Sequence, residues 1–498
     1  MSIDSYTFIF VFLPITLLGY YSIRRFGYQR LSMAWLVVAS VVFYGWFNPV
    51  YLGLILGSVV FNYVLGGTIS KRAGAGPPKA GALLALAIAV NLVLLGYFKY
   101  ANFFVDNMNA ILASDFNLQR IILPLAISFF TMQQIAYLVD SYRGQIAEHD
   151  LLKYSLLVTF FPKLLAGPIV RYNEMFPQEA KDRNTWCKRD DIVIGLSILF
   201  IGLFKKVVLA DGVAPYADDV FNLAAANAAP PLINAWIGAL GYTLQLYFDF
   251  SAYSDMAIGM GLMLGFRMPL NFWSPYKAVD VTDFWRRWHI TLSRFLRDYV
   301  YIPLGGNRKG SLRRNVNLMV TMLVAGIWHG AGWTFVIWGL MHGLYLVMSH
   351  MWRALQQSLH WDMDRSPRLL IVMSVLTTFV AVAVAWVFFR AESVEAAVVM
   401  IKGMVGLNGV VGSGWYIDRI GLIWICLLLV ICWFAPNSQE FMANYRTTFD
   451  AFGGRPVTTR NRWLRWSSTP VGATIVAGMT ALAILGMSKA SPFIYFQF

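Results

Sequence analysis

Long apolar runs separated by short polar segments dominate the chain. A helix needs about 20 apolar residues to cross a bilayer core of about 30 Å, and many runs approach that length. Lipid offers no partner to an unpaired backbone polar group, so each run predicts a helix that lies across or within a membrane. The runs lie near residues 5–23, 31–48, 50–68, 81–98, 121–139, 191–210, 232–249, 251–266, 316–350, 368–389, 418–435 and 469–487.

Two apolar stretches do not predict a single straight helix. The run 316–350 is too long for one span and contains Gly330, Gly332 and Gly343, so we expect two segments there. The stretch 151–170 has the composition of a broken or re-entrant segment buried in protein. Its interruptions are Lys153, Pro162, Lys163, Gly167 and Pro168. The pattern predicts an all-α polytopic integral membrane protein with roughly 11–13 transmembrane or re-entrant helices.

The stretch 279–306 has the pattern of a short interfacial amphipathic helix rather than of a span. Aromatic and aliphatic side chains recur at spacings of three and four, and a polar set follows the same spacing one residue further round. We expect this helix to lie at the membrane surface with its aromatic face down and His289 at the boundary between the faces. The apolar set consists of Trp285, Trp288, Leu292, Phe295 and Tyr299. The polar set consists of Arg286, His289, Ser293 and Arg297.

Composition and charge support this membrane interpretation. Of the 498 residues 58% are hydrophobic and 13% are charged, about half the charged share of soluble domains. The net charge of +14 comes from basic residues between apolar runs. The positive-inside rule then places 267–315 in the cytosol, and Arg24 and Arg25 after the first run place the N-terminus outside. Asp4 precedes that run and the arginines follow it, whereas a signal peptide has its positive charge before the apolar run. The first run therefore predicts a retained helix.

A basic nucleic-acid-binding face or motif is missing from the sequence, so we expect no nucleic-acid partner.

Two histidines are candidates for chemistry. His329 lies within the run 316–350, where burial favours a neutral imidazole that can accept a proton. The alternative is a core histidine bonded to a neighbouring helix. His289 lies on the predicted surface helix, where the alternative is a solvated residue of a membrane anchor. The residues themselves leave both alternatives open.

Two carboxylates lie within an apolar background. Asp249 and Asp255 require a partner or a water-filled cavity at membrane depth. They could line a substrate path, or pair with Arg267 or Arg286. The histidines show neither an HExxH spacing nor a nearby cysteine, so we expect no metal site.

The stretch DFWRRWHITLSRFLRDYVYIPLGGNRKG, followed about 40 residues after His289 by the WHG of 328–330, resembles the membrane-bound O-acyltransferase family. Within that family the resemblance is to the bacterial branch that acetylates polysaccharides, and it extends over most of the chain. The supporting stretches are FFPKLLAGPIVRY (160–172), GLFKKVVLADGVAPYADDVF (202–221), YFDFSAYSDMAIGMG (247–261), MPLNFWSPY (268–276) and SPFIYFQF (491–498).

The resemblance implies that His329 is the essential catalytic histidine and His289 its upstream polar partner. It implies a fold whose helices surround a central tunnel, with a cytosolic acyl-thioester donor, acetyl-CoA, and no permanently bound cofactor. The acceptor would be a hydroxyl of an exported polysaccharide such as alginate, reached directly or through a periplasmic acetyl-accepting protein. The location would be the bacterial inner membrane, among its lipids, with a periplasmic N-terminus. Residues expected to bind or surround substrate are Trp285, Arg286, Arg287, Trp328, Arg294, Arg297, Asp249 and Asp255.

We therefore expect one membrane-embedded acyltransferase domain over 1–498. Within it, 267–315 is the cytosolic basic and interfacial segment, and 316–350 carries the catalytic histidine. A transporter or flippase with an intramembrane histidine and aspartate path is the alternative from another class. A lipid or protein O-acyltransferase would share the fold and the histidines but use another acceptor. The sequence does not distinguish direct transfer to a glycan from relay through a partner protein.

Overall fold

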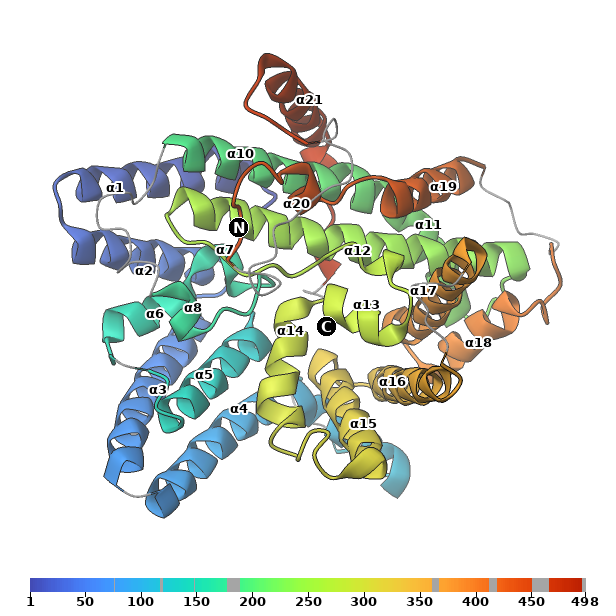
Figure 1. Ribbon diagram of the computed structural model, residues 1–498, viewed down its shortest axis with the longest axis horizontal. Helices are drawn as coiled ribbons and strands as arrows, with labels where there is room; N and C mark the ends of the chain where they lie inside the picture. The colour runs from blue at the N-terminus through green and yellow to red at the C-terminus, as the bar shows by residue number, and fades with distance from the viewer. Residues whose placement is uncertain are drawn as a thin grey trace. The chain divides into compact units, whose positions relative to one another are not determined.

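The computed structural model describes residues 1–75, 77–116, 120–146, 148–176, 189–360, 367–411, 419–449 and 465–494. Within these ranges the regular elements are helices (Figure 1). In the same ranges β-type backbone pairing is limited to one isolated bridge, between Pro269 and Phe449. The prediction of an all-α protein is confirmed.

Seven described helical stretches are long and apolar enough to cross a membrane. The prediction of a polytopic membrane protein is therefore confirmed. Two shorter apolar helices, α2 and α19, accompany them. The seven stretches are Phe8–Arg25, Val50–Gly74, Lys79–Leu112, Asp190–Ala225, Trp333–Ser358, Arg368–Arg390 and Pro470–Lys489.

The chain forms two compact units. The first comprises residues 1–203, 253–270 and 445–455. The second comprises residues 204–252, 271–444 and 456–498. One division falls within α12 (Leu232–Met263), so the runs 232–249 and 251–266, which the sequence presents separately, form one continuous helix. Nothing in the sequence between these runs ends a helix, because Phe250 and Ser251 are both compatible with helical backbone.

The first unit holds the N-terminal helices and the expected broken segment. In that segment α6 ends at Thr159 and α7 begins at Phe161, so the prediction of an interrupted helix is confirmed. The buried Lys163 ammonium donates to the Leu157 carbonyl, 2.6 Å away, which satisfies one backbone group that the break leaves open. The helices of this unit are α1 (Leu13–Arg25), α2 (Gln29–Gly45), α3 (Val50–Ala75), α4 (Pro77–Leu112), α5 (Ile127–Tyr142), α6 (Leu151–Thr159), α7 (Phe161–Leu164), α8 (Tyr172–Met175) and most of α10 (Arg189–Phe204).

The second unit holds the remaining helices, and its core is rich in aromatic rings. Its elements are η2 (Lys205–Ala210), α11 (Asp211–Ala225), the first part of α12, η3 (Pro275–Lys277), α13 (Val281–Arg287), α14 (Ile290–Leu296), η4 (Arg297–Tyr301), α15 (Gly310–His329), α16 (Trp333–Ser358), α17 (Arg368–Arg390), α18 (Val394–Met404), α19 (Arg419–Phe434), α20 (Ser438–Phe441), α21 (Pro470–Gly486) and η7 (Met487–Lys489).

The prediction of one surface helix over 279–306 is wrong. The helix is broken between α13 and α14, where His289 adopts a left-handed backbone with φ of 41°. Trp288 and His289 are both buried, and the Trp288 ring packs on Phe272, with 5.0 Å between ring centroids. The periodic pattern is compatible with a straight helix, but the hydrogen bonds that Asn271 makes to His289 and Thr291 hold the chain in a turn there.

The expected division of 316–350 is confirmed. Helix α15 ends at His329 and α16 begins at Trp333, while Gly343 lies inside α16 without interrupting it. The two helices cross closely at a pair of glycines. A Cβ at Gly326 would lie 3.1 Å from the Gly339 Cα, and a Cβ at Gly339 would lie 2.6 Å from the Met322 carbonyl oxygen. Only glycine permits this approach, which is typical of close helix pairs in membranes.

A buried ion-pair network anchors the second unit. The Lys206 ammonium lies 2.8 Å from carboxylate oxygens of both Asp211 and Asp249, and its side chain has no exposed surface. The Ser491 hydroxyl donates to Asp211 at 2.7 Å, and the Ile494 backbone N–H donates to Asp249 at 3.0 Å. The network therefore joins η2, α11, α12 and the segment after α21 through charge-assisted hydrogen bonds.

We expect Gly339→Ala to lower the free energy of unfolding by about 1–3 kcal/mol, because the new methyl group must force α15 and α16 apart. The matched control is Gly478→Ala, since a Cβ at Gly478 in α21 meets no atom within 4 Å. Thermal unfolding of both purified variants in detergent measures the difference. Equal stabilities would contradict the close crossing.

We expect Lys206→Met to lower the free energy of unfolding by about 3–5 kcal/mol, because two buried carboxylates lose their common cation. The double variant Lys206→Met, Asp249→Asn removes one of these stranded charges and should recover part of the loss. Denaturant unfolding of the single and double variants tests this. A double variant less stable than Lys206→Met would show that the pairing is not what stabilises this core.

Candidate active site

The site begins at the turn between α13 and α14, where Asn271 holds His289. The Asn271 side-chain oxygen lies 3.1 Å from His289 Nδ1, and it accepts hydrogen bonds from the backbone N–H and the hydroxyl of Thr291, at 3.3 and 2.9 Å. The Asn271 backbone carbonyl accepts from the Ile290 N–H at 2.9 Å. Asn271 and His289 have no exposed surface. One buried residue therefore binds the backbone N–H groups of Ile290 and Thr291, the Thr291 hydroxyl and His289 Nδ1.

These hydrogen bonds define the protonation of the His289 ring. A backbone N–H only donates, so the Asn271 atom that meets the Thr291 N–H is the amide oxygen, an acceptor. His289 Nδ1 must then donate to that oxygen, which leaves the lone pair of the neutral ring on Nε2. His289 lies outside the seven candidate membrane-spanning helices. Burial lowers the pKa of its imidazole to about 3, so the ring is neutral at physiological pH.

His329 is the last residue of α15 and joins the same aromatic cluster. Its side chain is 5% exposed, and its ring centroid lies 4.8 Å from that of Trp328 and 5.0 Å from that of Trp338. The Trp328 ring in turn lies 6.4 Å from the ring of His289. The structure thus brings both predicted histidines against one indole, in surroundings made mainly of aromatic rings.

A third histidine belongs to this cluster. The rings of His342 and Trp338 lie 4.8 Å apart, and the Trp285 indole N–H donates to His342 Nδ1 at 3.3 Å. His342 Nδ1 therefore accepts, and the ring proton lies on Nε2. Within the described residues, no hydrogen-bond acceptor meets this Nε2 or the Trp338 Nε1, although both atoms are buried.

Sequence reasoning missed His342 and Asn271. Thirteen positions along one helix would place His329 and His342 on nearly opposite faces, but the break at Gly330–Gly332 brings both rings onto Trp338. The available signal was the spacing of four between Trp338 and His342, which places them on one face of α16. The sequence offered no comparable signal for Asn271, whose role depends on the left-handed turn.

The predicted tryptophans, Trp285 and Trp328, lie in the aromatic cluster. The predicted arginines lie on α13, α14 and η4, where they are exposed or half-buried. Arg287 pairs with Asp283 at 2.9 Å and Arg297 with Asp298 at 2.6 Å. Arg294 is half-buried. Arg286 is exposed, and it belongs to a group of charges around the His350 ring. That group consists of Arg314, Arg353, Arg286 and Asp280.

Asp249 does not pair with either of the expected arginines. Asp249 pairs with Lys206 instead of Arg267 or Arg286, and it also accepts from the Ile494 backbone. The prediction of an arginine partner is therefore wrong, because the cation comes from η2, beside α12 in this unit. Asp255 is buried on the part of α12 that belongs to the first unit.

In the described ranges no three His, Cys, Asp or Glu side chains are grouped as metal ligands.

The cluster has the parts needed for proton transfer at a hydroxyl. His289 presents a lone pair at Nε2, and His342 presents an N–H at its own Nε2. The surrounding rings exclude water, so charges that develop there interact strongly with nearby dipoles. Such surroundings suit a general base that stays neutral until it accepts a proton.

Comparison with known proteins assigns the chain to a family. The family model described as MBOAT, membrane-bound O-acyltransferase family, matches residues 80–389. A peptidoglycan O-acetyltransferase of Helicobacter pylori is 46% identical over 81% of this chain and 79% of its own length. A probable alginate O-acetylase of Pseudomonas putida is 39% identical over the full length of both proteins. Another from Pseudomonas aeruginosa is 44% identical over 81% of this chain and 75% of its own length. The chain is therefore an O-acetyltransferase that belongs to the membrane-bound O-acyltransferase family.

Proposed function

We propose that this enzyme transfers an acetyl group from acetyl-CoA in the bacterial cytosol to a hydroxyl supplied from the periplasmic side of the inner membrane. The final acceptor is an exported polysaccharide, reached directly or through a periplasmic acetyl-accepting protein. The names of the relatives, which refer to alginate and peptidoglycan, support a polysaccharide acceptor. They favour it over the lipid, protein and transport alternatives. The observation that carries the proposal is the buried cluster in which the rings of His289 and His329 both lie against Trp328.

In the proposed reaction an imidazole nitrogen of His329 takes the proton of the acceptor hydroxyl. The hydroxyl oxygen bonds to the thioester carbonyl carbon, the C–S bond breaks, and the proton passes from the imidazolium to the leaving CoA thiolate. The products are an acetyl ester and CoA thiol, and His329 returns to its neutral form. General-base catalysis of this kind contributes about 10²–10⁴-fold to the rate.

In this proposal His289 and His342 form hydrogen bonds to the reactants, and neither ring gains or loses a proton. The His289 Nε2 lone pair can accept a hydrogen bond from the acceptor hydroxyl and orient it, because Nδ1 already donates to Asn271. The same protonation argues against His289 as a donor to the carbonyl oxygen. In this cluster, the buried donors that meet no acceptor in the described residues include His342 Nε2, Trp338 Nε1 and Trp386 Nε1. We propose that these donors stabilise the negative charge that develops on the carbonyl oxygen of the thioester.

The arginines would attract the phosphates of the donor. Trp285 contacts His342, while its neighbour Arg286 is exposed among Arg314 and Arg353. The basic group therefore lies one residue along α13 from the histidine cluster. We propose that acetyl-CoA approaches from this end, which we place in the cytosol, with the N-terminus in the periplasm.

We expect His329→Gln to lower acetyl transfer by about 10²–10⁴-fold at equal abundance in the membrane, because the base is lost. The measurement is CoA thiol released from acetyl-CoA by membrane vesicles, together with the acetyl ester content of each surface glycan. His360→Gln, at an exposed histidine, is the matched control. Unchanged transfer in His329→Gln would refute the base assignment.

We expect Arg286→Gln to raise the KM for acetyl-CoA about 2- to 5-fold, since an exposed charge contact contributes modestly to binding. Added salt should raise the KM of the wild-type enzyme more than that of the variant, because screening weakens the lost contact. Arg72→Gln, an exposed arginine of the first unit, serves as the control. Equal salt dependence of the wild type and Arg286→Gln would count against donor binding at this end.

A further inference from the structure

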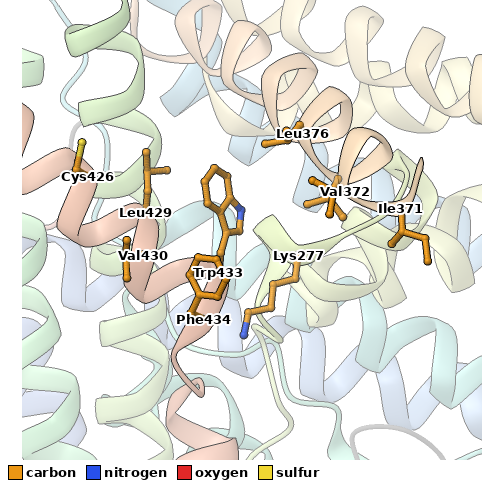
Figure 2. Close-up of a pocket in the computed structure, with 10 residues that line it drawn as sticks. Lys277, Ile371, Val372, Leu376, Cys426, Leu429, Val430, Trp433 and Phe434 are labelled. Carbon is orange, nitrogen blue, oxygen red and sulfur yellow. The ribbon is translucent and has the colours of Figure 1, made fainter. Parts of the chain in front are cut away.

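An apolar groove opens between α17 and α19 in the second unit, apart from the histidine cluster. Its volume is about 690 Å³, within the range of ligand sites. Figure 2 shows side chains of α17 and α19 facing one another across the groove, with the Trp433 indole between the helices and Lys277 at one end. Its walls are formed by Ile371, Val372, Val375, Leu376, Cys426, Leu429, Val430, Trp433 and Phe434.

The groove is apolar along its length and cationic at one end. The positions from Cys426 to Phe434 follow one face of α19 over about 12 Å, at 1.5 Å per residue. At the end near Phe434, the half-buried Lys277 ammonium donates to the Ala435 carbonyl at 2.9 Å. In the described part of the chain no carboxylate lies within ion-pair distance of Lys277.

A second lysine adds positive charge at the same end. Lys205 contacts the Ser438 hydroxyl at 3.3 Å, just beyond the end of α19. A ligand that complements this site has an apolar chain as long as the walls and an anionic group at one end.

We propose that the groove binds one acyl chain of an anionic membrane phospholipid, with the lipid phosphate at Lys277. Bulk lipid covers any apolar surface, but this groove also has a lysine at one end that pairs with no carboxylate of the described residues. Free phosphate would leave the apolar walls exposed, and the polar arm of CoA would be poorly solvated between them.

The bound lipid would also support the active-site turn. The Trp433 indole N–H donates to the Tyr276 carbonyl at 3.1 Å, and the Tyr276 ring stacks on Trp288 with 6.2 Å between centroids. Trp288 directly precedes His289. An acyl chain against Trp433 therefore contacts the aromatic layer that packs behind the turn.

The test is native mass spectrometry of the full chain in detergent, with phosphatidylglycerol or phosphatidylcholine of identical acyl chains. We expect the wild type to retain one phosphatidylglycerol in preference to phosphatidylcholine. Lys277→Met should lower that occupancy about fivefold, and Lys277→Arg should restore it. Val430→Trp should also lower it, because the indole fills the groove.

Two controls separate the groove from the rest of the lipid-facing surface. Lys402→Met removes an exposed lysine of α18, and Ile423→Trp adds an indole on α19 outside the groove. Both should bind phosphatidylglycerol as the wild type does. Equal retention of both lipids, an unchanged Lys277→Met variant, or equal loss in the controls would overturn the proposal. Displacement of the lipid by millimolar inorganic phosphate would show that the phosphate alone is recognised. None of these outcomes depends on acetyl transfer.

Discussion

The hydrogen bonds that Asn271 makes to the turn between α13 and α14 are the constraint on which the active site depends. A non-glycine residue with positive φ is strained, and the chain adopts this backbone at His289 because Asn271 accepts from three groups of the turn. The same bonds direct the His289 lone pair to Nε2. One buried amide thus determines both where the helix breaks and which nitrogen of His289 can accept a proton.

The aromatic surroundings of the three histidines have a common physical consequence. Burial disfavours the charged form of an imidazole, and a neutral ring carries one donor and one acceptor nitrogen. At His289 the hydrogen bond to Asn271 leaves an acceptor for a ligand, whereas at His342 the bond from Trp285 leaves a donor. Chemically equivalent side chains therefore acquire opposite capacities from their neighbours.

Much of the architecture could be predicted from the apolar runs, including the interruption near Pro162 and the division after His329. Helix length and glycine position are local properties, so they can be read from the sequence. The break at His289 could not, because its cause is Asn271, which lies 18 residues earlier and follows no periodic pattern. The partner of Asp249 was missed for the same reason, since Lys206 meets it only after α12 has packed. The residues alone made His329 and His289 candidates and left structural roles open for both, and the resemblance to a family implied their catalytic roles.

The Lys206 network has a consequence for how the protein is made. Lys206 and Asp211 leave the ribosome almost together, and Asp249 follows soon after, but Ser491 lies 285 positions later. The helices inserted in between must therefore hold a charged cluster whose polar shell is incomplete. The buried Lys206 and its two carboxylates therefore gain their full set of hydrogen bonds only after the segment that contains Ser491 and Ile494 has been synthesised and has packed against them.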